Sequence, residues 1–218
     1  MRFHVRRKGR SGRRYLHIHG NEETAREVLN LLMETHPGIA YLIDNQDRNV
    51  NILGCKIDPN RLFSRVGAGK SLHDQNPGLP PARLQTVLDF LDHHREDLVR
   101  HLEPKDGDLL FALHNNREYS VTEELAQSDD TSIPQKDHPR EFFLCTDSRD
   151  FALLRHSPYN VVLQNRKPAV DDGSLSRLAA KRGFRYVNLE CAIGQLDAQK
   201  ERVQWVEDHL PARHPRNP

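Results

Sequence analysis

His19 and Glu22 are the first residues whose types and spacing indicate chemistry. A short apolar strand over 15–18 breaks at Gly20, and a helical pattern follows over 24–34. The imidazole and the carboxylate therefore lie at a strand end and in the turn after it, three residues apart. Both side chains can bind one metal ion at that spacing, but a lone His-x-x-Glu pair is weak evidence because such pairs are common by chance.

His114 is the candidate for a third ligand. Residues 108–116 predict an apolar strand that ends on this histidine, and open α/β sheets bind their ligands at the carboxyl ends of strands. His17 is the competitor, but it alternates with Ile18, which predicts that it points into the other layer of the sheet or supports the ligands from behind. Two imidazoles and one carboxylate match a zinc site with a fourth position left for water, so we expect one Zn²⁺ per chain.

Glu190 ends the last predicted strand, over 186–190. A carboxylate that does not bind the metal can act as a general base, taking a proton from water and passing it to a leaving amine. Zinc lowers the pKa of its water to about 7 and polarises a scissile carbonyl. This combination predicts a metallohydrolase.

Asn60 and Arg61 follow a natural turn at Asp58-Pro59. An amide beside a guanidinium fork suits bidentate recognition of a substrate carboxylate. The alternative is a turn that carries a surface arginine.

The elements that must position these residues alternate between strands and helices. Short apolar segments predict strands over 39–43, 50–53, 141–145 and 160–164. Apolar residues at 3.6-residue spacing predict helices over 82–102, 174–182 and 196–209. This order predicts an α/β fold with a mixed, mostly parallel sheet flanked by helices. A length of 218 residues fits a single compact domain.

The chain divides into three parts. Residues 1–14 contain seven Lys or Arg and no acid, and they predict a basic strand over 2–6 followed by a hairpin. Residues 15–210 form the catalytic domain, and residues 211–218 are expected to be a disordered tail. Within the domain, the polar segment 119–139 is either a lid over the sheet or disordered.

Composition argues against several classes of protein. The 32 basic and 31 acidic residues balance, so we expect neither a nucleic acid nor a membrane as partner. No apolar run is long enough to span a membrane, and no apolar core follows the basic N-terminus as in a signal peptide. Cys55, Cys145 and Cys191 lack C-x-x-C spacing and indicate reduced, buried thiols, which favours a cytoplasmic protein. The oligomeric state is not indicated.

A glycine-rich segment over 67–71 is similar to the end of a phosphate-binding loop. That motif requires a glycine at the position of Ser64, and an apolar strand directly before it. Neither is present, so we do not expect a nucleotide site.

Three short motifs carry a resemblance to a known family. Residues 19–22 read His-Gly-Asn-Glu, residues 58–63 read Asp-Pro-Asn-Arg-Leu-Phe, and residues 113–115 read Leu-His-Asn. These resemble the signatures of the aspartoacylase and succinylglutamate desuccinylase family of the zinc carboxypeptidase superfamily, with Pro59 in place of Leu and Ala112 where an acid is usual. The resemblance covers roughly residues 15–197. Within it, the strand that ends at Glu190 is similar to the family's strand that ends on the catalytic glutamate.

The resemblance implies a zinc-dependent hydrolase with a mostly parallel sheet between helices. It implies a role for six residues: His19, Glu22 and His114 as ligands, Glu190 as base and proton shuttle, and Asn60 with Arg61 as a carboxylate clamp. Members of the family cleave amide bonds in N-acyl amino acids or at the ends of peptides.

Two departures from the family pattern affect the expected function. The family usually has another arginine ahead of the Asn-Arg pair that stabilises the oxyanion, and here only Arg48 and Lys56 lie upstream, neither of which matches cleanly. With 218 residues, we also expect no counterpart of the C-terminal β domain that aspartoacylase-like proteins have. We therefore expect a carboxypeptidase or peptide amidase that acts on small peptides, such as cell-wall peptides. An N-acyl amino acid deacylase and a non-catalytic zinc- or carboxylate-binding module remain the alternatives.

Overall fold

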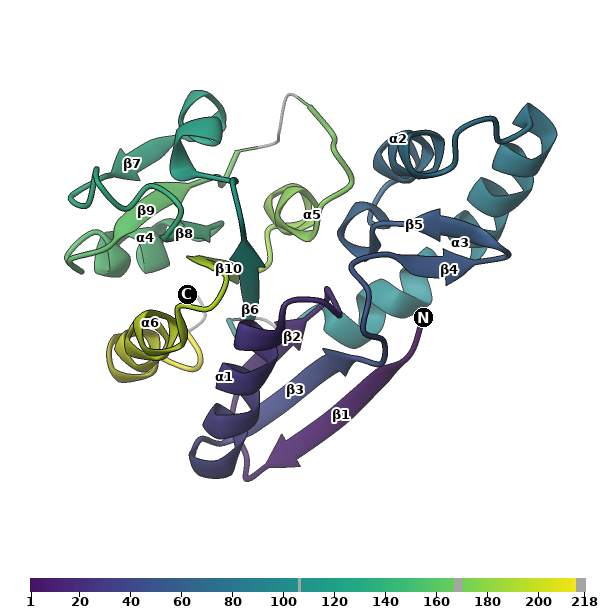
Figure 1. Cartoon of the computed structure of the whole chain (residues 1–218). Coiled ribbons are helices and arrows are strands. Elements are labelled where there is room, and N and C mark those ends of the chain that lie inside the picture. Colours follow the sequence, from purple (N-terminus) through teal and green to yellow (C-terminus); the bar gives the residue numbers. More distant parts are fainter. Residues whose placement is uncertain (106, 167–169, 215–218) are drawn as a thin grey trace.

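A mixed sheet forms the centre of the computed structural model, which describes residues 1–105, 107–166 and 170–214 (Figure 1). Within these residues the sheet has eight strands in the order β1-β3-β2-β6-β10-β8-β9-β7. The strands are β1 (Phe3–Lys8), β2 (Arg13–His17), β3 (Gly38–Ile43), β6 (Leu109–Asn116), β7 (Asp130–Ser132), β8 (Phe142–Cys145), β9 (Asn160–Leu163) and β10 (Tyr186–Ala192). The neighbours β3–β2, β2–β6, β6–β10 and β8–β9 are parallel, and β1–β3, β10–β8 and β7–β9 are antiparallel.

Helices cover both faces of this sheet. The helices are α1 (Glu23–Thr35), α2 (Arg65–Gln75), α3 (Pro81–Leu102), α4 (Ser148–Leu154), α5 (Leu175–Arg182) and α6 (Leu196–His209). Apolar side chains of α1, α4 and α6 pack on one face, and those of α3 and α5 pack on the other. The predicted α/β class, with a mixed sheet flanked by helices in one compact domain, is confirmed.

Alternation along β6 determines which side chains face which layer. Phe111 and Leu113 pack toward the layer of α1 and α6, whereas Leu110 and Ala112 pack toward α3 and α5. Because side chains alternate between the faces of a strand, His114 continues the second set and lies on the face of α3 and α5.

A second, small sheet lies beside the main one. The predicted strand over 50–53 becomes β4 (Val50–Ile52), which pairs with β5 (Cys55–Ile57) rather than with the main sheet, and packs with α2 and α3. The glycine-rich segment 67–71 lies inside α2, so its backbone is helical and forms no phosphate-binding loop.

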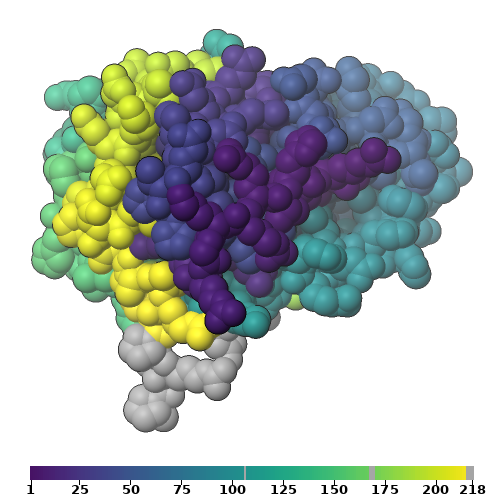
Figure 2. All heavy atoms as spheres, turned by 90° about the horizontal axis from the view of Figure 1, so that it is seen from below, coloured from purple at the N-terminus to yellow at the C-terminus, as the bar shows by residue number. Residues whose placement is uncertain are grey.

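The prediction of an N-terminal hairpin was wrong. β1 pairs antiparallel with β3, and β3 lies between β1 and β2, so the two basic segments do not contact each other as a hairpin. Pairing with β3 buries part of Phe3 against the core, whereas a local hairpin with the basic residues 13–14 would bring like charges together. β1 forms an exposed edge of the sheet, and the purple segment in Figure 2 shows it on the molecular surface.

The prediction of a disordered tail was wrong for residues 211–214, whereas residues 215–218 lie outside the described part. Arg213 forms a β-bridge and an ion pair with Asp108. His214 is buried, and its Nε2 lies 2.9 Å from Oδ1 of Asp150, a carboxylate that also accepts two hydrogen bonds from Arg185. These buried partners hold residues 213 and 214 in place.

The segment 119–139 has regular structure. It contains two short 3-10 helices, η2 (Val121–Glu123) and η3 (Leu125–Gln127), and the strand β7, which pairs with β9 at the sheet edge. The three cysteines are free and buried, as predicted. None of the helices in the described ranges combines the length and the apolar character that a membrane span requires.

Candidate metal centre

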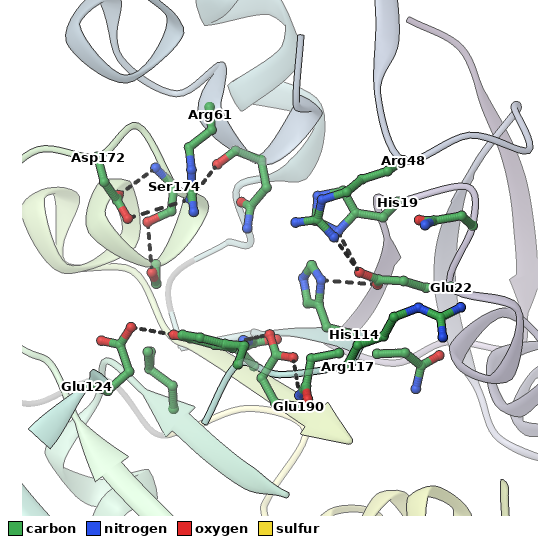
Figure 3. Close-up of a pocket in the computed structure, with 18 of the residues that line it drawn as sticks. His19, Glu22, Arg48, Arg61, His114, Arg117, Glu124, Asp172, Ser174 and Glu190 are labelled. Atoms are coloured by element: carbon green, nitrogen blue, oxygen red, sulfur yellow. Dashed lines mark hydrogen bonds and ion pairs between the residues drawn. The ribbon is translucent and has the colours of Figure 1, made fainter. Parts of the chain in front are cut away.

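Three of the predicted residues meet in the interior at the carboxyl ends of β2 and β6. Nδ1 of His19 lies 2.8 Å from Oε1 of Glu22, and Nδ1 of His114 lies 3.2 Å from Oε2 of the same carboxylate (Figure 3). The exposed fractions are 2% for His19 and 3% for Glu22 and His114. β2 brings His19 to the sheet edge, Glu22 directly precedes α1, and β6 supplies His114.

The geometry of this group fits a metal ion. One ligand atom from each of the three residues lies within 4.8 Å of the others. Oε2 of Glu22 is buried, and its contact with Nδ1 of His114 at 3.2 Å is an ion pair that lacks hydrogen-bond geometry, so a metal ion could bind between these two atoms. Two imidazole nitrogens and a carboxylate are the donor set of three-ligand zinc sites, which leave a coordination position open.

Asp58 fixes the orientation of His19 from the side away from Glu22. Oδ1 of Asp58 lies 2.8 Å from Nε2 of His19, the arrangement in which a second carboxylate orients a metal-binding imidazole. Asp58 is itself held because it caps the 3-10 helix η1 (Pro59–Arg61), accepting a hydrogen bond from the backbone N–H of Asn60 at 2.8 Å. The sequence reading treated Asp58 only as a turn residue and missed this role.

The pKa values of these groups reflect the two facing carboxylates. Burial lowers the pKa of His19, but Glu22 and Asp58 outweigh burial and raise it to about 9. Burial raises the pKa of Glu22, but His19 and His114 hold it well below its usual range. His19 therefore carries a proton at neutral pH in the metal-free protein, and a metal ion would displace that proton.

His17 lies behind the ligands, on the α1 side. Its Nε2 donates to the backbone carbonyl of Glu22 at 3.0 Å, and burial lowers its pKa to about 4. Its side chain therefore supports the position of Glu22 and is neutral, which agrees with the expectation of a supporting residue.

Glu190 lies beside the candidate ligands on the adjacent strand. In the parallel pairing of β6 and β10, Glu190 is directly opposite His114. The carboxylate is buried, and burial raises its pKa above the ordinary value. A buried carboxylate with a raised pKa beside a metal group is suited to proton transfer.

Asn60 and Arg61 line the same cavity from η1. Oδ1 of Asn60 accepts a hydrogen bond from the backbone N–H of Leu175 at 3.1 Å, which ties η1 to the start of α5. Arg61 is partly exposed and lies 3.5 Å from Asp172. The six predicted residues thus line one cavity of about 440 Å³, and their roles stay predictions.

Arg48 is one of three further arginines that line this cavity, with Arg117 and Arg177, and it is the one that contacts Glu22. Its guanidinium donates to Oε1 of Glu22 at 3.3 Å and to Oδ2 of Asp58 at 3.1 Å. Lys56, the other residue upstream of the Asn-Arg pair, does not line the cavity. No local signal distinguishes the two, because the loop between β3 and β4 sets the direction of Arg48.

The proton on His19 predicts a pH dependence of the metal-free protein. A folded pKa of about 9, against 6.5 as the ordinary value, gives stability that is fully present below pH 6.5 and is lost as pH rises through 9. We expect the free energy of unfolding to fall by on the order of 3 kcal/mol across this window. Urea unfolding in chelator at several pH values measures this, and Asp58→Asn should reduce the fall. A flat profile in the wild type would contradict the pairing.

Comparisons with known proteins identify the fold. No protein-family model and no curated protein match the sequence. The crystal structure of the succinylglutamate desuccinylase from Chromobacterium violaceum is similar with a TM-score of 0.50 and 15% identity, over 89% of this chain and 60% of that one. A putative metallopeptidase from Shewanella amazonensis is less similar, with a TM-score of 0.38 and 10% identity over 97% of this chain and 88% of its own.

The desuccinylase likeness shows a shared α/β fold. The chain spans 60% of the length of that enzyme. Because one fold can host many activities, the function has to be argued from the side chains in the cavity.

Proposed function

We propose that the protein is a zinc-dependent hydrolase that cleaves an amide bond next to a free carboxylate, as a carboxypeptidase or peptide amidase. The observation that carries this proposal is the group of His19, Glu22 and His114. Two imidazole Nδ1 atoms face one buried carboxylate, and a second buried carboxylate, Glu190, lies on the neighbouring strand. We infer one zinc ion per chain, held by the first three residues.

Glu190 is the proposed base and proton shuttle. Zinc in such a site activates water near neutral pH and polarises a carbonyl group. Glu190 takes a proton from the attacking water and delivers it to the nitrogen of the leaving amine. Its burial keeps bulk water away from the carboxylate during this transfer, and its position opposite His114 brings it within the same cavity as the ligands.

Arg48 is the proposed electrostatic partner of the reacting carbonyl. The guanidinium lies against Glu22 and Asp58, and the side chain, which is 48% exposed, lines the cavity. A fixed cation at this place can donate hydrogen bonds to the negative charge that develops on the carbonyl oxygen. Arg48 thus supplies the oxyanion-stabilising arginine that the sequence did not identify.

Asn60 and Arg61 form the proposed clamp for the substrate carboxylate. The amide nitrogen of Asn60 is available because its Oδ1 is the atom bonded to Leu175. The guanidinium of Arg61 donates a hydrogen bond to the backbone carbonyl of Asn60 at 3.2 Å. Its ion pair with the half-exposed Asp172 is loose, at 3.5 Å, so a substrate carboxylate can replace Asp172. A planar fork suits two parallel hydrogen bonds to a carboxylate.

An N-acyl amino acid deacylase is the second candidate. The fold shared with a succinylglutamate desuccinylase supports it, and its substrates also have a carboxylate near the scissile amide. The two candidates differ in the group on the acyl side of that bond, and both use the same clamp and base.

Hydrolysis of matched substrate pairs tests this proposal. Dipeptides and N-acetyl amino acids are assayed with the zinc-loaded protein, each with a free and with an amidated C-terminal carboxylate. We expect amidation to lower kcat/KM by roughly 100-fold, the loss of a charge-assisted bidentate contact, and Arg61→Ala to remove most of that preference. Arg65→Ala, a similarly exposed arginine outside the cavity, is the control. An equal rate for both members of every pair would refute the clamp.

A further inference from the structure

Both oxygens of the Glu190 carboxylate accept a hydrogen bond from an asparagine. Nδ2 of Asn188 lies 3.2 Å from Oε1, and Nδ2 of Asn116 lies 3.1 Å from Oε2. Neither asparagine belongs to the proposed metal group, the clamp or the oxyanion contact. The pair therefore requires an explanation of its own.

The register of the two strands places these amides on either side of Glu190. On β10, Asn188 and Glu190 are two residues apart and share one face, as His114 and Asn116 do on β6. Asn188 lies two residues before Glu190 on β10. Asn116 lies on β6, two residues after His114, which is the residue paired with Glu190. The two N–H donors approach the carboxylate from opposite directions.

The amides are themselves held with their nitrogens toward Glu190. Asn116 also donates from Nδ2 to the backbone carbonyl of Arg140 at 3.0 Å, so both N–H bonds of its amide are used. Oδ1 of Asn116 and Oδ1 of Asn188 are buried without a hydrogen-bond partner. Buried polar atoms without partners are rare and cost stability, and turning either amide would place an oxygen against the carboxylate. In this arrangement the Oδ1 atoms of both asparagines accept no hydrogen bond, while both Nδ2 atoms donate one to Glu190.

We propose that Asn116 and Asn188 are positioning residues that hold the Glu190 carboxylate in one orientation toward the His19–Glu22–His114 group. They exchange no proton with the substrate and act through Glu190. A displaced base loses much of its catalytic effect even when it remains present, because proton transfer depends on distance and direction. This inference rests on the proposed function for its catalytic part, whereas the contact itself is independent of it.

Kinetics test the catalytic part. With the peptide or N-acetyl amino acid that the wild type hydrolyses fastest, Asn116→Leu and Asn188→Leu should each lower kcat by about 10- to 100-fold. KM should stay nearly unchanged, since neither residue belongs to the proposed Asn60–Arg61 clamp for the substrate carboxylate. Asn76→Leu is the matched control, because it removes three hydrogen bonds of a half-buried asparagine outside the cavity. Serine variants repeat the measurement if a leucine variant does not fold. An unchanged kcat, or a rise in KM alone, would overturn the positioning role.

Unfolding tests the contact without any substrate. Urea midpoints are measured for the full chain as wild type, Asn188→Leu, Glu190→Ala and the double variant, and likewise for Asn116. Coupled residues give non-additive effects, so each asparagine substitution should shift the midpoint less in the Glu190→Ala background. Additive shifts would refute the contact of the two asparagines with Glu190 even if hydrolysis is found. If the wild type hydrolyses no substrate, the proposed function fails, and the coupling still decides whether the asparagines hold the Glu190 carboxylate.

Discussion

Glu190→Gln should abolish nearly all hydrolysis while leaving zinc binding intact. Glutamine keeps the shape of the side chain, but its single amide oxygen can accept a hydrogen bond from only one of Asn116 and Asn188, and it cannot accept a proton. General base catalysis contributes about 10²- to 10⁴-fold, so kcat should fall by that factor. Since Glu190 is not among the three proposed ligands, zinc content should stay at about one per chain. Steady-state kinetics and elemental analysis of the same preparations measure both effects.

A control substitution shows whether the fall in kcat is specific to Glu190 or follows from the loss of any carboxylate. Glu96→Gln removes a charge on α3 that pairs with Arg182, outside the cavity, and should leave kcat unchanged. If Glu190→Gln retained full activity, another residue would be the base. If neither the wild type nor the variant hydrolysed any substrate although zinc is bound, the non-catalytic binding module would be the better description.

The sequence predicted the sheet and its helices because the apolar patterns are strong. The closing helix was predicted over 196–209 and is observed as Leu196–His209, and the strands that carry His114 and Glu190 were predicted within two residues at either end. Two-residue alternation and 3.6-residue periodicity of apolar residues show which side chains will be buried, and the buried side chains form the core of the fold. The N-terminal pairing failed because β1 pairs with β3, about 35 residues away, and local patterns do not specify such partners.

The candidate site was predictable where strand ends carry the chemistry. His19, His114 and Glu190 all lie at or next to carboxyl ends of neighbouring parallel strands, so a sheet topology suffices to bring them together. Asn116 and Asn188 could have been found by the same two-residue alternation that places them on the faces of His114 and Glu190. Arg48 could not have been found in this way, because it extends from a loop whose direction depends on tertiary contacts.

His114→Ala should remove the metal. The variant keeps His19 and Glu22 but loses one of three ligand side chains. Loss of a residue that only orients a ligand weakens metal binding by about 10- to 100-fold, so loss of a ligand should weaken it by at least about 100-fold. Asp58→Asn removes the second carboxylate that faces His19 and Arg48 but keeps all three proposed ligands, so it should lie between the wild type and His114→Ala. A ligand-bound native state is stabilised in proportion to the logarithm of ligand concentration over Kd, so the zinc-induced rise in Tm should follow the same order.

His214→Ala is the control for this series. His214 is also a buried histidine paired with a carboxylate, Asp150, and with Asp147 the two form a second group whose ligand atoms lie close enough for a metal ion. Arg185 donates two hydrogen bonds to Asp150, and we expect this cation to compete with a metal ion there. The variant should lower Tm by itself yet keep about one zinc per chain and the full zinc-induced rise. If His114→Ala bound zinc as tightly as the wild type, or if the wild type bound none after reconstitution, the paired histidines would be structural. The hydrolase proposal would then fail, because Glu190 would have no activated water from which to take a proton.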